Sequence, residues 1–335
     1  MPETIATETV SCCVCGKDAH TAVGSGRDFE YGSCANAWTF VVCAGCGHHY
    51  LRTRPGPGAL GTIYPPNYGN YSNSEKPSLT FKLKAWLERR ALRKLAGRTR
   101  SNPAVYDIGC GDGRLLDSVK ASFPKTQALA GCEIAPFAAQ AATGKGYAVG
   151  IGSFESIPVL PESYDLVFLI QVLEHLGDPN AAIQKIARML RSGGLAVFET
   201  PSTECFDFRL FHKRYWGGYH FPRHFNLFKR DNAERLLAKA GLTPVSYRVK
   251  LQPVHWVWTA HHWLQEMGAP AWLYRSLNIK NPFWIGLGTV IDAMQVGLFR
   301  RSSNMQIIVR KAGALEPVMH LHNATTTGSP AGQAC

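Results

Sequence analysis

The 335-residue chain lacks a leader-like N-terminus, has few charged residues and contains no long uninterrupted apolar run. Charged side chains make up 18% of the residues and apolar ones 45%, which is typical of a folded globular chain and excludes a largely disordered one. The first ten residues are polar, without a basic segment followed by an apolar one, so we expect a cytoplasmic protein. Asp292, Gln295 and several glycines interrupt the most apolar stretch, residues 282–299, so we expect a buried or interfacial segment there and no membrane span.

Acidic residues are also scarce: 24 Asp and Glu stand against 36 Lys and Arg, which gives a net charge of +12. Such an excess suits anionic partners, which include nucleic acids, metabolites and membrane surfaces. The basic residues are scattered, with only short clusters in residues 82–94 and 98–100. We therefore expect a basic surface that serves anionic metabolites or membranes, and we do not expect a nucleic acid as the partner.

Two close cysteine pairs stand near the N-terminus, Cys12-x-x-Cys15 and Cys43-x-x-Cys46, and a glycine follows each. In a reducing compartment such pairs bind metal more often than they form disulfides, and two of them supply the four thiolates of a closed, structural Zn²⁺ site. AWTFVVC predicts a strand that enters the second pair, so residues 1–51 are predicted to form a small zinc ribbon. Unligated buried cysteines are the alternative, and the nearby residues that can replace a ligand are Cys13, Cys34, His48 and His49.

Residues 52–80 are rich in Pro, Gly, Ser and Asn and are predicted to be a linker. Three tyrosines either anchor it by packing or belong to a flap over a cofactor: Tyr64, Tyr68 and Tyr71. A helix is predicted from about Phe81 to Ala96, with an apolar face formed by Leu83, Leu87, Ala91 and Leu95. Residues 313–335 are predicted to be a disordered tail.

From residue 104 onward, strand-like segments alternate with helical ones, which predicts a parallel sheet with helices on both faces. The first strand, AVYDIGC, runs into a turn that contains Asp107, Gly109, Gly111 and Gly113. A dinucleotide site would carry G-x-G-x-x-G there, to place a diphosphate on a helix N-terminus. The Asp107 carboxylate instead favours a cofactor with a ribose, an ammonium and a positive sulfonium, because it would repel a phosphate. Glu133 ends the second strand, where it can accept hydrogen bonds from both ribose hydroxyls.

Residues 104–200 resemble class I S-adenosylmethionine (SAM) dependent methyltransferases. The resemblance is carried by the turn after the first strand, by Glu133 and by two later segments. These segments are SFESIPVLPESYDLVFLIQVLEHL and RMLRSGGLAVFETPS. The resemblance implies an α/β fold with a Rossmann-like, seven-stranded sheet and helices on both faces, over residues 81–312, and SAM as the cofactor. It also implies that Ser153 and Phe154, with Glu155 beside them, hold the adenine and that Gln171 lines the methionine. Another nucleotide-binding α/β fold is the alternative.

Methyl transfer is an in-line displacement in which an acceptor atom attacks the sulfonium methyl, so the protein mainly orients the reactants and removes a proton. Acceptor residues are expected in two segments inserted at the C-terminal edge of the sheet, residues 201–229 and 251–303. The first insertion contains the candidate bases His212, Tyr215, Tyr219, His220 and His224. His175, in LEHLGD, follows the fourth strand and is expected at the same cleft, although many methyltransferases of diverse substrate carry Glu-His there.

In the first insertion, YHFPRHFNLF resembles the Tyr-His-Glu-His-x-x-Tyr-Phe segment of zinc-containing deoxysugar C-methyltransferases, which also begin with a Cys-rich zinc module. Arg223 stands in place of the glutamate and Leu227 in place of the second tyrosine, and no long extra C-terminal α/β domain is recognised. The resemblance implies an active-site role for His224. We predict O- or C-methylation of a natural-product, sugar or lipid-like metabolite, with His224 as the first candidate base, His220 the second and His175 the third.

Two other functions stay open on the sequence. A zinc-ribbon rRNA methyltransferase fits the charge, but QVLEH follows the fourth strand where an Asn/Asp-Pro-Pro-Tyr segment would hold an amino-bearing base. A non-catalytic scaffold with a SAM fold is opposed by the intact acidic and glycine positions. Salt-dependent RNA binding would support the first alternative, and failure to bind SAM would support the second.

The second insertion is rich in tryptophan: most of the chain's eight tryptophans lie between Trp256 and Trp284. Tryptophan suits a boundary between apolar and polar surroundings, and Arg300 and Arg301 can meet anionic head groups. We therefore predict an aromatic or lipid-like acceptor and a protein that rests peripherally on the membrane surface. Packing of these helices on the sheet, or a homodimer interface, is the alternative.

Overall fold

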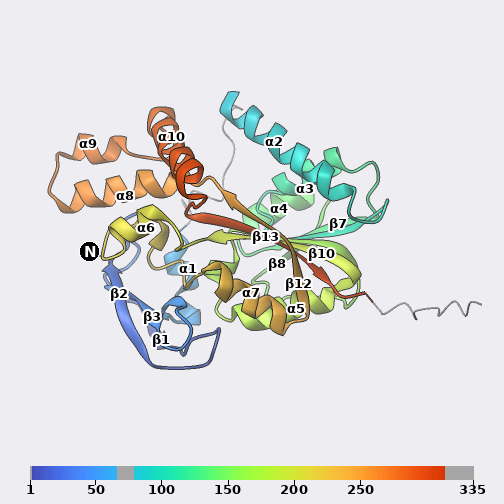
Figure 1. The fold of residues 1–335 in the computed structure, drawn as a ribbon, viewed down its shortest axis with the longest axis horizontal. Coiled ribbons are helices and arrows are strands. Elements are labelled where there is room, and N and C mark those ends of the chain that lie inside the picture. The colour runs from blue at the N-terminus through green and yellow to red at the C-terminus, as the bar shows by residue number, and fades with distance from the viewer. Residues whose placement is uncertain (1, 66–78, 314–335) are drawn as a thin grey trace, which may run out of the picture.

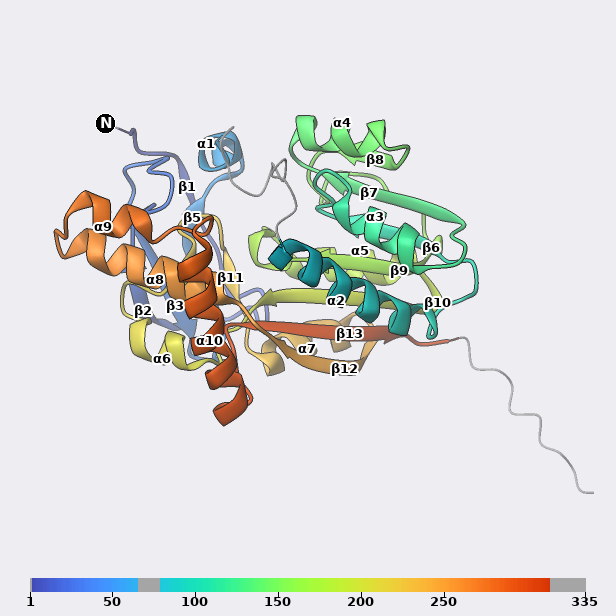
Figure 2. The same cartoon turned by 90° about the horizontal axis from the view of Figure 1, so that it is seen from above.

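The computed structural model describes residues 2–65 and 79–313, and within the second range it describes side chains from residue 85 onward. Tyr68 and Tyr71 of the predicted flap, and the predicted tail beyond residue 313, lie outside the described residues. Figures 1 and 2 show a central sheet with helices on both faces and a smaller β module at one end of it.

The central sheet has seven strands in the order β12-β13-β10-β9-β6-β7-β8. Its parallel strands are β6 (Ala104–Ile108), β7 (Ala128–Glu133), β8 (Ala148–Ile151), β9 (Tyr164–Ile170) and β10 (Leu190–Pro201). β13 (Asn304–Lys311) pairs antiparallel with β10, and β12 (Leu242–Lys250) pairs antiparallel with β13. This sheet confirms the predicted seven-stranded α/β fold.

Helices cover both faces of this sheet (Figure 1). The helices are α2 (Leu79–Ala96), α3 (Arg114–Ser122), α4 (Pro136–Gly144), α5 (Pro179–Met189) and α7 (Arg230–Lys239). Every residue of β6 is buried, as expected for a strand with helices on both sides. Val105 packs in one apolar cluster with α2 and α3, whereas its neighbour Tyr106 packs in another with α5 and α7, because successive side chains of a strand point to opposite faces.

Helix α2 confirms the helix predicted near residues 81–96, but the face predicted for it is partly wrong. Leu95 is buried as expected, and Leu92 is buried with it. Leu87 is 52% exposed and Ala91 is exposed as well. A surface helix buries only the stripe that meets its neighbours, and Leu92 and Leu95, three residues apart, are the pair that reaches the cluster with β6 and α3.

The N-terminal segment forms a second sheet, which a distant part of the chain completes. β2 (His20–Gly26), β3 (Trp38–Cys43) and β4 (His49–Leu51) pair in sequence, and β3 confirms the strand predicted before the second cysteine pair. The fourth strand, β11 (Asn226–Leu227), comes from the first predicted insertion and pairs with β4. The short strands β1 (Thr7–Thr9) and β5 (Thr53–Pro55) pair separately. The first insertion and the N-terminal segment therefore share one apolar core.

Three helices form the second predicted insertion: α8 (Pro253–Glu266), α9 (Ala271–Ser276) and α10 (Pro282–Phe299). They lie next to the N-terminal module and α6 (Phe206–Phe211) in both views (Figures 1 and 2). Within residues 2–65 and 79–313, α10 is the one helix long and apolar enough to cross a bilayer, and 17% of it is buried. Its exposure contradicts the buried segment that the sequence analysis gave as one alternative.

Candidate active site

The predicted cofactor loop follows β6 and is held by the carboxylate of Glu133 at the end of β7. One carboxylate oxygen accepts a hydrogen bond from the Gly111 N–H and the other accepts one from the Ala135 N–H, each at 2.9 Å. Each oxygen keeps a second lone pair, which can accept a hydrogen bond from a ribose hydroxyl. Gly109 has a left-handed φ of 74°, and a Cβ there would lie 2.6 Å from Val172 Cγ2, so the loop requires glycine at this position.

Asp107 is the next-to-last residue of β6 and is 3% exposed. Burial raises the pKa of its carboxyl to about 8, and the negative charge of Glu133 adds to this effect while Arg114 opposes it. A buried carboxyl of this kind is stabilised in its charged form by a cation nearby. The position therefore suits the ammonium or sulfonium group of the expected cofactor.

The other predicted cofactor residues lie on neighbouring loops. Ser153 follows β8, and its hydroxyl lies 3.1 Å from that of Ser156. The ring of Phe154 is buried in the core, with Lys185 Nζ 4.7 Å from the ring centroid, so this ring contributes to packing against α5. Gln171 follows β9 in the left-handed region, with a φ of 54°, and its side-chain amide donates to Asn304 Oδ1 at 3.0 Å.

The parallel pairing of β6 and β9 brings a second loop to the cofactor loop. Ile108 lies opposite Leu169, so the residues after both strands emerge at the same edge of the sheet. Val172 approaches Gly109 there, and the following residues form the 3₁₀ turn Leu173–His175. The loop that carries His175 therefore leaves the same edge of the sheet as the predicted cofactor loop and approaches it at Val172.

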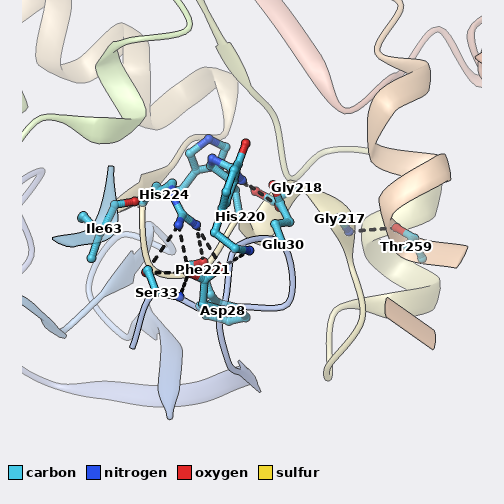
Figure 3. A network of polar contacts seen from close by, with 12 residues as sticks. Asp28, Glu30, Ser33, Ile63, Gly217, Gly218, His220, Phe221, His224 and Thr259 are labelled. Atoms are coloured by element: carbon cyan, nitrogen blue, oxygen red, sulfur yellow. Dashed lines mark hydrogen bonds and ion pairs between the residues drawn. The ribbon is translucent and has the colours of Figure 1, made fainter. Parts of the chain in front are cut away.

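Three histidine rings meet at this edge. His175 comes from the loop after β9, whereas His220 and His224 come from the first insertion, and Figure 3 shows the latter two close together. The ring centroids are 4.7 Å apart for His175 and His224, 4.9 Å for His220 and His224, and 6.2 Å for His175 and His220. The structure thus brings together the three histidines that the sequence nominated.

The rings of His175 and His224 are each oriented by a hydrogen bond from Nδ1 to a backbone carbonyl oxygen. His175 Nδ1 lies 2.9 Å from the Arg223 carbonyl oxygen and 2.9 Å from the Tyr64 hydroxyl. His224 Nδ1 lies 2.8 Å from the Gly218 carbonyl oxygen. Burial lowers the pKa of His175 to about 3 and the pKa of His224 well below its usual value. Both rings are therefore neutral at pH 7, with the proton on Nδ1 and the lone pair on Nε2.

His220 has a carboxylate as its partner. Its Nδ1 lies 2.7 Å from Glu30 Oε1, and the two side chains are 14% and 4% exposed. Burial opposes the ionisation of Glu30, but the nearby His220 holds the pKa of Glu30 below its usual value. A carboxylate that orients an imidazole in this way is a recurrent arrangement of a general base.

Arg223 stands where the deoxysugar C-methyltransferases have a glutamate. It connects the turn that carries His220 and His224 to the N-terminal module. Its guanidinium forms an ion pair with Asp28 at 2.9 Å, with both side chains fully buried, and donates to the Ile63 carbonyl oxygen at 2.7 Å. Burial opposes the ionisation of Asp28, yet the guanidinium keeps the pKa of Asp28 at about 2. The turn that carries His220 and His224 is therefore anchored to residues near the N-terminus.

Two acidic residues of the histidine cluster, Glu174 and Glu30, were not predicted as site residues from the sequence. Glu174 is fully buried, and burial raises its pKa to about 8; its only signal was its place directly before His175. Glu30 lies 190 residues before His220 and has no local motif. The other candidate bases have different surroundings: His212 Nδ1 lies 3.1 Å from the Arg209 carbonyl oxygen, and the ring of Tyr219 stacks in the core on Phe40 and Phe221.

The two cysteine pairs converge on one point. Cys12 Sγ lies 3.5 Å from Cys46 Sγ, and Cys15 Sγ lies 3.4 Å from Cys43 Sγ. All four sulfur atoms lie within 4.8 Å of one another, which fits a tetrahedral Zn²⁺ site. The residues considered as substitutes have other partners: Cys13 contacts His48 and Asn226, Cys34 lies near Trp38, and His49 contacts Thr203.

Residues 83–247 match a family model described as "Methyltransferase domain". By this match the segment resembles a methyltransferase domain. It includes the cofactor loop, the loop with Glu174 and His175, and the insertion with His220 and His224. The cysteine module and α10 lie outside the matched segment.

Parts of the chain also resemble named proteins. The malonyl-[acyl-carrier protein] O-methyltransferase of Hahella chejuensis is 30% identical over 155 residues, which cover 44% of this chain and 54% of that protein. The ubiquinone biosynthesis O-methyltransferase of Nitrosomonas europaea is 32% identical over 109 residues, 30% of this chain and 44% of that protein. The chain thus spans about half the length of the curated relatives it matches. A SAM-dependent methyltransferase of Archaeoglobus fulgidus aligns at a TM-score of 0.45 and 16% identity, over 70% of this chain and 100% of that one.

Proposed function

We propose that the protein transfers the methyl group of SAM to an oxygen or carbon atom of a small-molecule acceptor, and that His220 is the general base. The observation that carries this proposal is the Glu30–His220 pair, whose imidazole lies in one cluster with His175 of the loop after β9. The two named relatives are O-methyltransferases, which favours oxygen over carbon as the methylated atom.

SAM supplies an electrophilic methyl group on a sulfonium, and this chain has side chains suited to bind it. Glu133 offers lone pairs to the ribose hydroxyls, and Asp107 offers a buried carboxyl, its pKa raised to about 8 by burial, that a bound cation would stabilise in its charged form. Ser153 and the backbone of Phe154 are the residues we assign to the adenine, and Gln171 to the methionine. Because the reaction is a displacement, the acceptor must lie on the far side of the methyl group, within reach of the histidine cluster.

The contacts favour His220 over His224, which the sequence ranked first. Burial lowers the pKa of His224 and of His175 far below neutrality, so neither is a strong proton acceptor at pH 7. His220 donates its Nδ1 proton to Glu30, which makes Nε2 the basic nitrogen and stabilises the imidazolium that forms. The acceptor's proton therefore moves to Nε2 of His220 as its oxygen or carbon atom attacks the methyl group.

We assign the four-cysteine cluster to a structural zinc ion. Cys12, Cys15, Cys43 and Cys46 fill all four tetrahedral positions, so such an ion has no open site for a substrate. Its role would be to hold the N-terminal module, which carries Glu30 to the active site.

We assign a lipid-like or aromatic acceptor and peripheral contact with the cytoplasmic side of a membrane. One stripe of α10 is apolar and exposed along its length: Phe283, Leu287, Val290, Met294 and Leu298. Trp272 is 74% and Trp263 is 46% exposed near this stripe in sequence, which suits insertion at a bilayer surface. A second copy of the chain that covers the same stripe is the competing occupant.

The proposed base is tested with labelled SAM and a fractionated metabolite extract as the source of acceptors. His220→Ala should lower the methyl-transfer rate by about 10²–10⁴-fold while the affinity for SAM stays unchanged. His212→Ala is the matched control, because His212 lies in the same insertion but outside the cluster. A His220→Ala enzyme with a normal rate would refute the assignment.

A further inference from the structure

Glu174 presents a buried carboxylate oxygen that has no hydrogen-bond partner. Its side chain is fully buried, and Oε2 accepts a hydrogen bond from the Thr200 hydroxyl at 2.9 Å. Among the described residues, none donates a hydrogen bond to the other oxygen, Oε1. An acceptor left unpaired in the interior is destabilising, which favours a bound ligand at Oε1.

Two imidazole nitrogens point toward this oxygen. His175 Nε2 and His224 Nε2 each lie 4.0 Å from Glu174 Oε1, which is too long for a hydrogen bond. Because both rings hold their proton at Nδ1 on a backbone carbonyl, each Nε2 carries a lone pair. Three potential ligand atoms therefore converge in a buried space, and the carboxyl oxygen lies beyond hydrogen-bonding distance of both nitrogens.

We propose that Glu174, His175 and His224 bind one divalent transition-metal ion through Glu174 Oε1 and the two Nε2 atoms. Potential ligand atoms of the three side chains lie within 4.8 Å of one another. Ions of this class bind imidazole and carboxylate at about 2.0–2.2 Å, so each ligand atom needs to move only by a few tenths of an ångström. Two histidines with one carboxylate form a ligand set of Zn²⁺ or Fe²⁺ sites that keep open positions.

The surroundings support a built site, because every ligand has its own anchor. The Arg223 carbonyl oxygen orients His175, the Gly218 carbonyl oxygen orients His224, and the Thr200 hydroxyl holds Glu174. Partners of this kind fix the tautomer and the direction of the ligands in metal sites. The His175 side chain is 17% exposed, which gives an ion a route from solvent.

The site deepens the proposed function, and this consequence rests on it. A cation with three protein ligands can bind a hydroxyl or enol oxygen of the acceptor at an open position and lower the pKa of that oxygen. The ring of His220 lies 4.9 Å from that of His224, so the proton of a bound acceptor would have a base nearby. The acceptor class would then be a metabolite with an acidic oxygen.

Metal content of the full-length protein provides the first test. Zinc-loaded protein, dialysed against metal-free buffer, should hold about two ions per chain by elemental analysis, one in the cysteine cluster and one here. His175→Ala with His224→Ala should reduce the content to about one, and Glu174→Gln should do so without removing side-chain volume. His212→Ala should keep about two. Wild-type protein that holds only the ion lost on Cys15→Ser would overturn the inference.

Cobalt provides a spectroscopic check that a structural role of the histidines would not change. Co²⁺ added to protein with a zinc-filled cysteine cluster should give absorption bands of nitrogen and oxygen ligation, without thiolate charge transfer. These bands should be absent in Glu174→Gln, while SAM binding by calorimetry shows that this variant is folded. Bands of equal strength in Glu174→Gln would overturn the assignment of Glu174.

The two proposals fail in different ways. Methyl transfer that continues unchanged after this ion is removed would overturn its role with the acceptor and leave the proposed function standing. A protein that binds the second ion but neither binds SAM nor transfers methyl groups would overturn the proposed function and leave the metal site standing.

Discussion

Replacement of Glu133 by alanine removes the carboxylate on which both the cofactor loop and the expected ribose contacts depend. In the free protein Glu133 accepts hydrogen bonds from the Gly111 and Ala135 N–H groups at 2.9 Å. A hydrogen bond to a charged group contributes about 1.5–3 kcal/mol, so the loss of the ribose contacts should weaken SAM binding by about 10–150-fold. Isothermal titration calorimetry with SAM measures this change directly.

A graded series separates the ribose contacts from the loop. Glu133→Gln keeps one carbonyl oxygen and the side-chain volume, so its affinity for SAM should lie between those of the wild type and Glu133→Ala. Glu234→Ala is the matched control, because Glu234 pairs with Arg230 on the surface of α7, outside the predicted site. Unchanged affinity in a folded Glu133→Ala protein would show that the cofactor is not held at the end of β7.

Three further predictions address the scaffold and the surface. Asp28→Ala leaves the fully buried Arg223 without its partner and should lower the free energy of unfolding by about 3–5 kcal/mol in denaturant titrations; a change below 1 kcal/mol would contradict the role of this pair. Because the pKa of Asp28 is lowered to about 2 in the folded protein, the stability it contributes is present above its usual pKa and should be lost as the pH falls toward 2. Chelation of zinc, or Cys15→Ser, should unfold the N-terminal module and expose its tryptophan, Trp38, to fluorescence quenchers. Unchanged fluorescence in the metal-free protein would refute the structural role of zinc. In flotation at low salt the protein should bind anionic liposomes, and binding should be lost when Trp263 and Trp272 become alanine. Protein that stays in the soluble fraction at every salt concentration would refute the proposed membrane contact.

Local sequence patterns were sufficient for the cofactor loop, the cysteine cluster and the sheet. The acidic residue and glycines of the turn after β6 lie within a few residues of one another, and so do the members of each cysteine pair. Such patterns survive in a linear sequence because their geometry is set by the backbone of one turn or strand. The strand–helix alternation could be predicted because it is also a local pattern: each element shows its own apolar periodicity.

The histidine cluster was decided by the tertiary structure. His220 and His224 could be nominated as bases from the sequence, but our proposal of His220 rests on its pairing with Glu30 across 190 residues and on the burial of His224. The surroundings of Glu174 also depend on the fold, because the first insertion places His224 Nε2 4.0 Å from its unpaired oxygen. Protonation and metal affinity depend on burial and on partners brought together by chain folding. Neighbouring residues in the sequence do not determine either property.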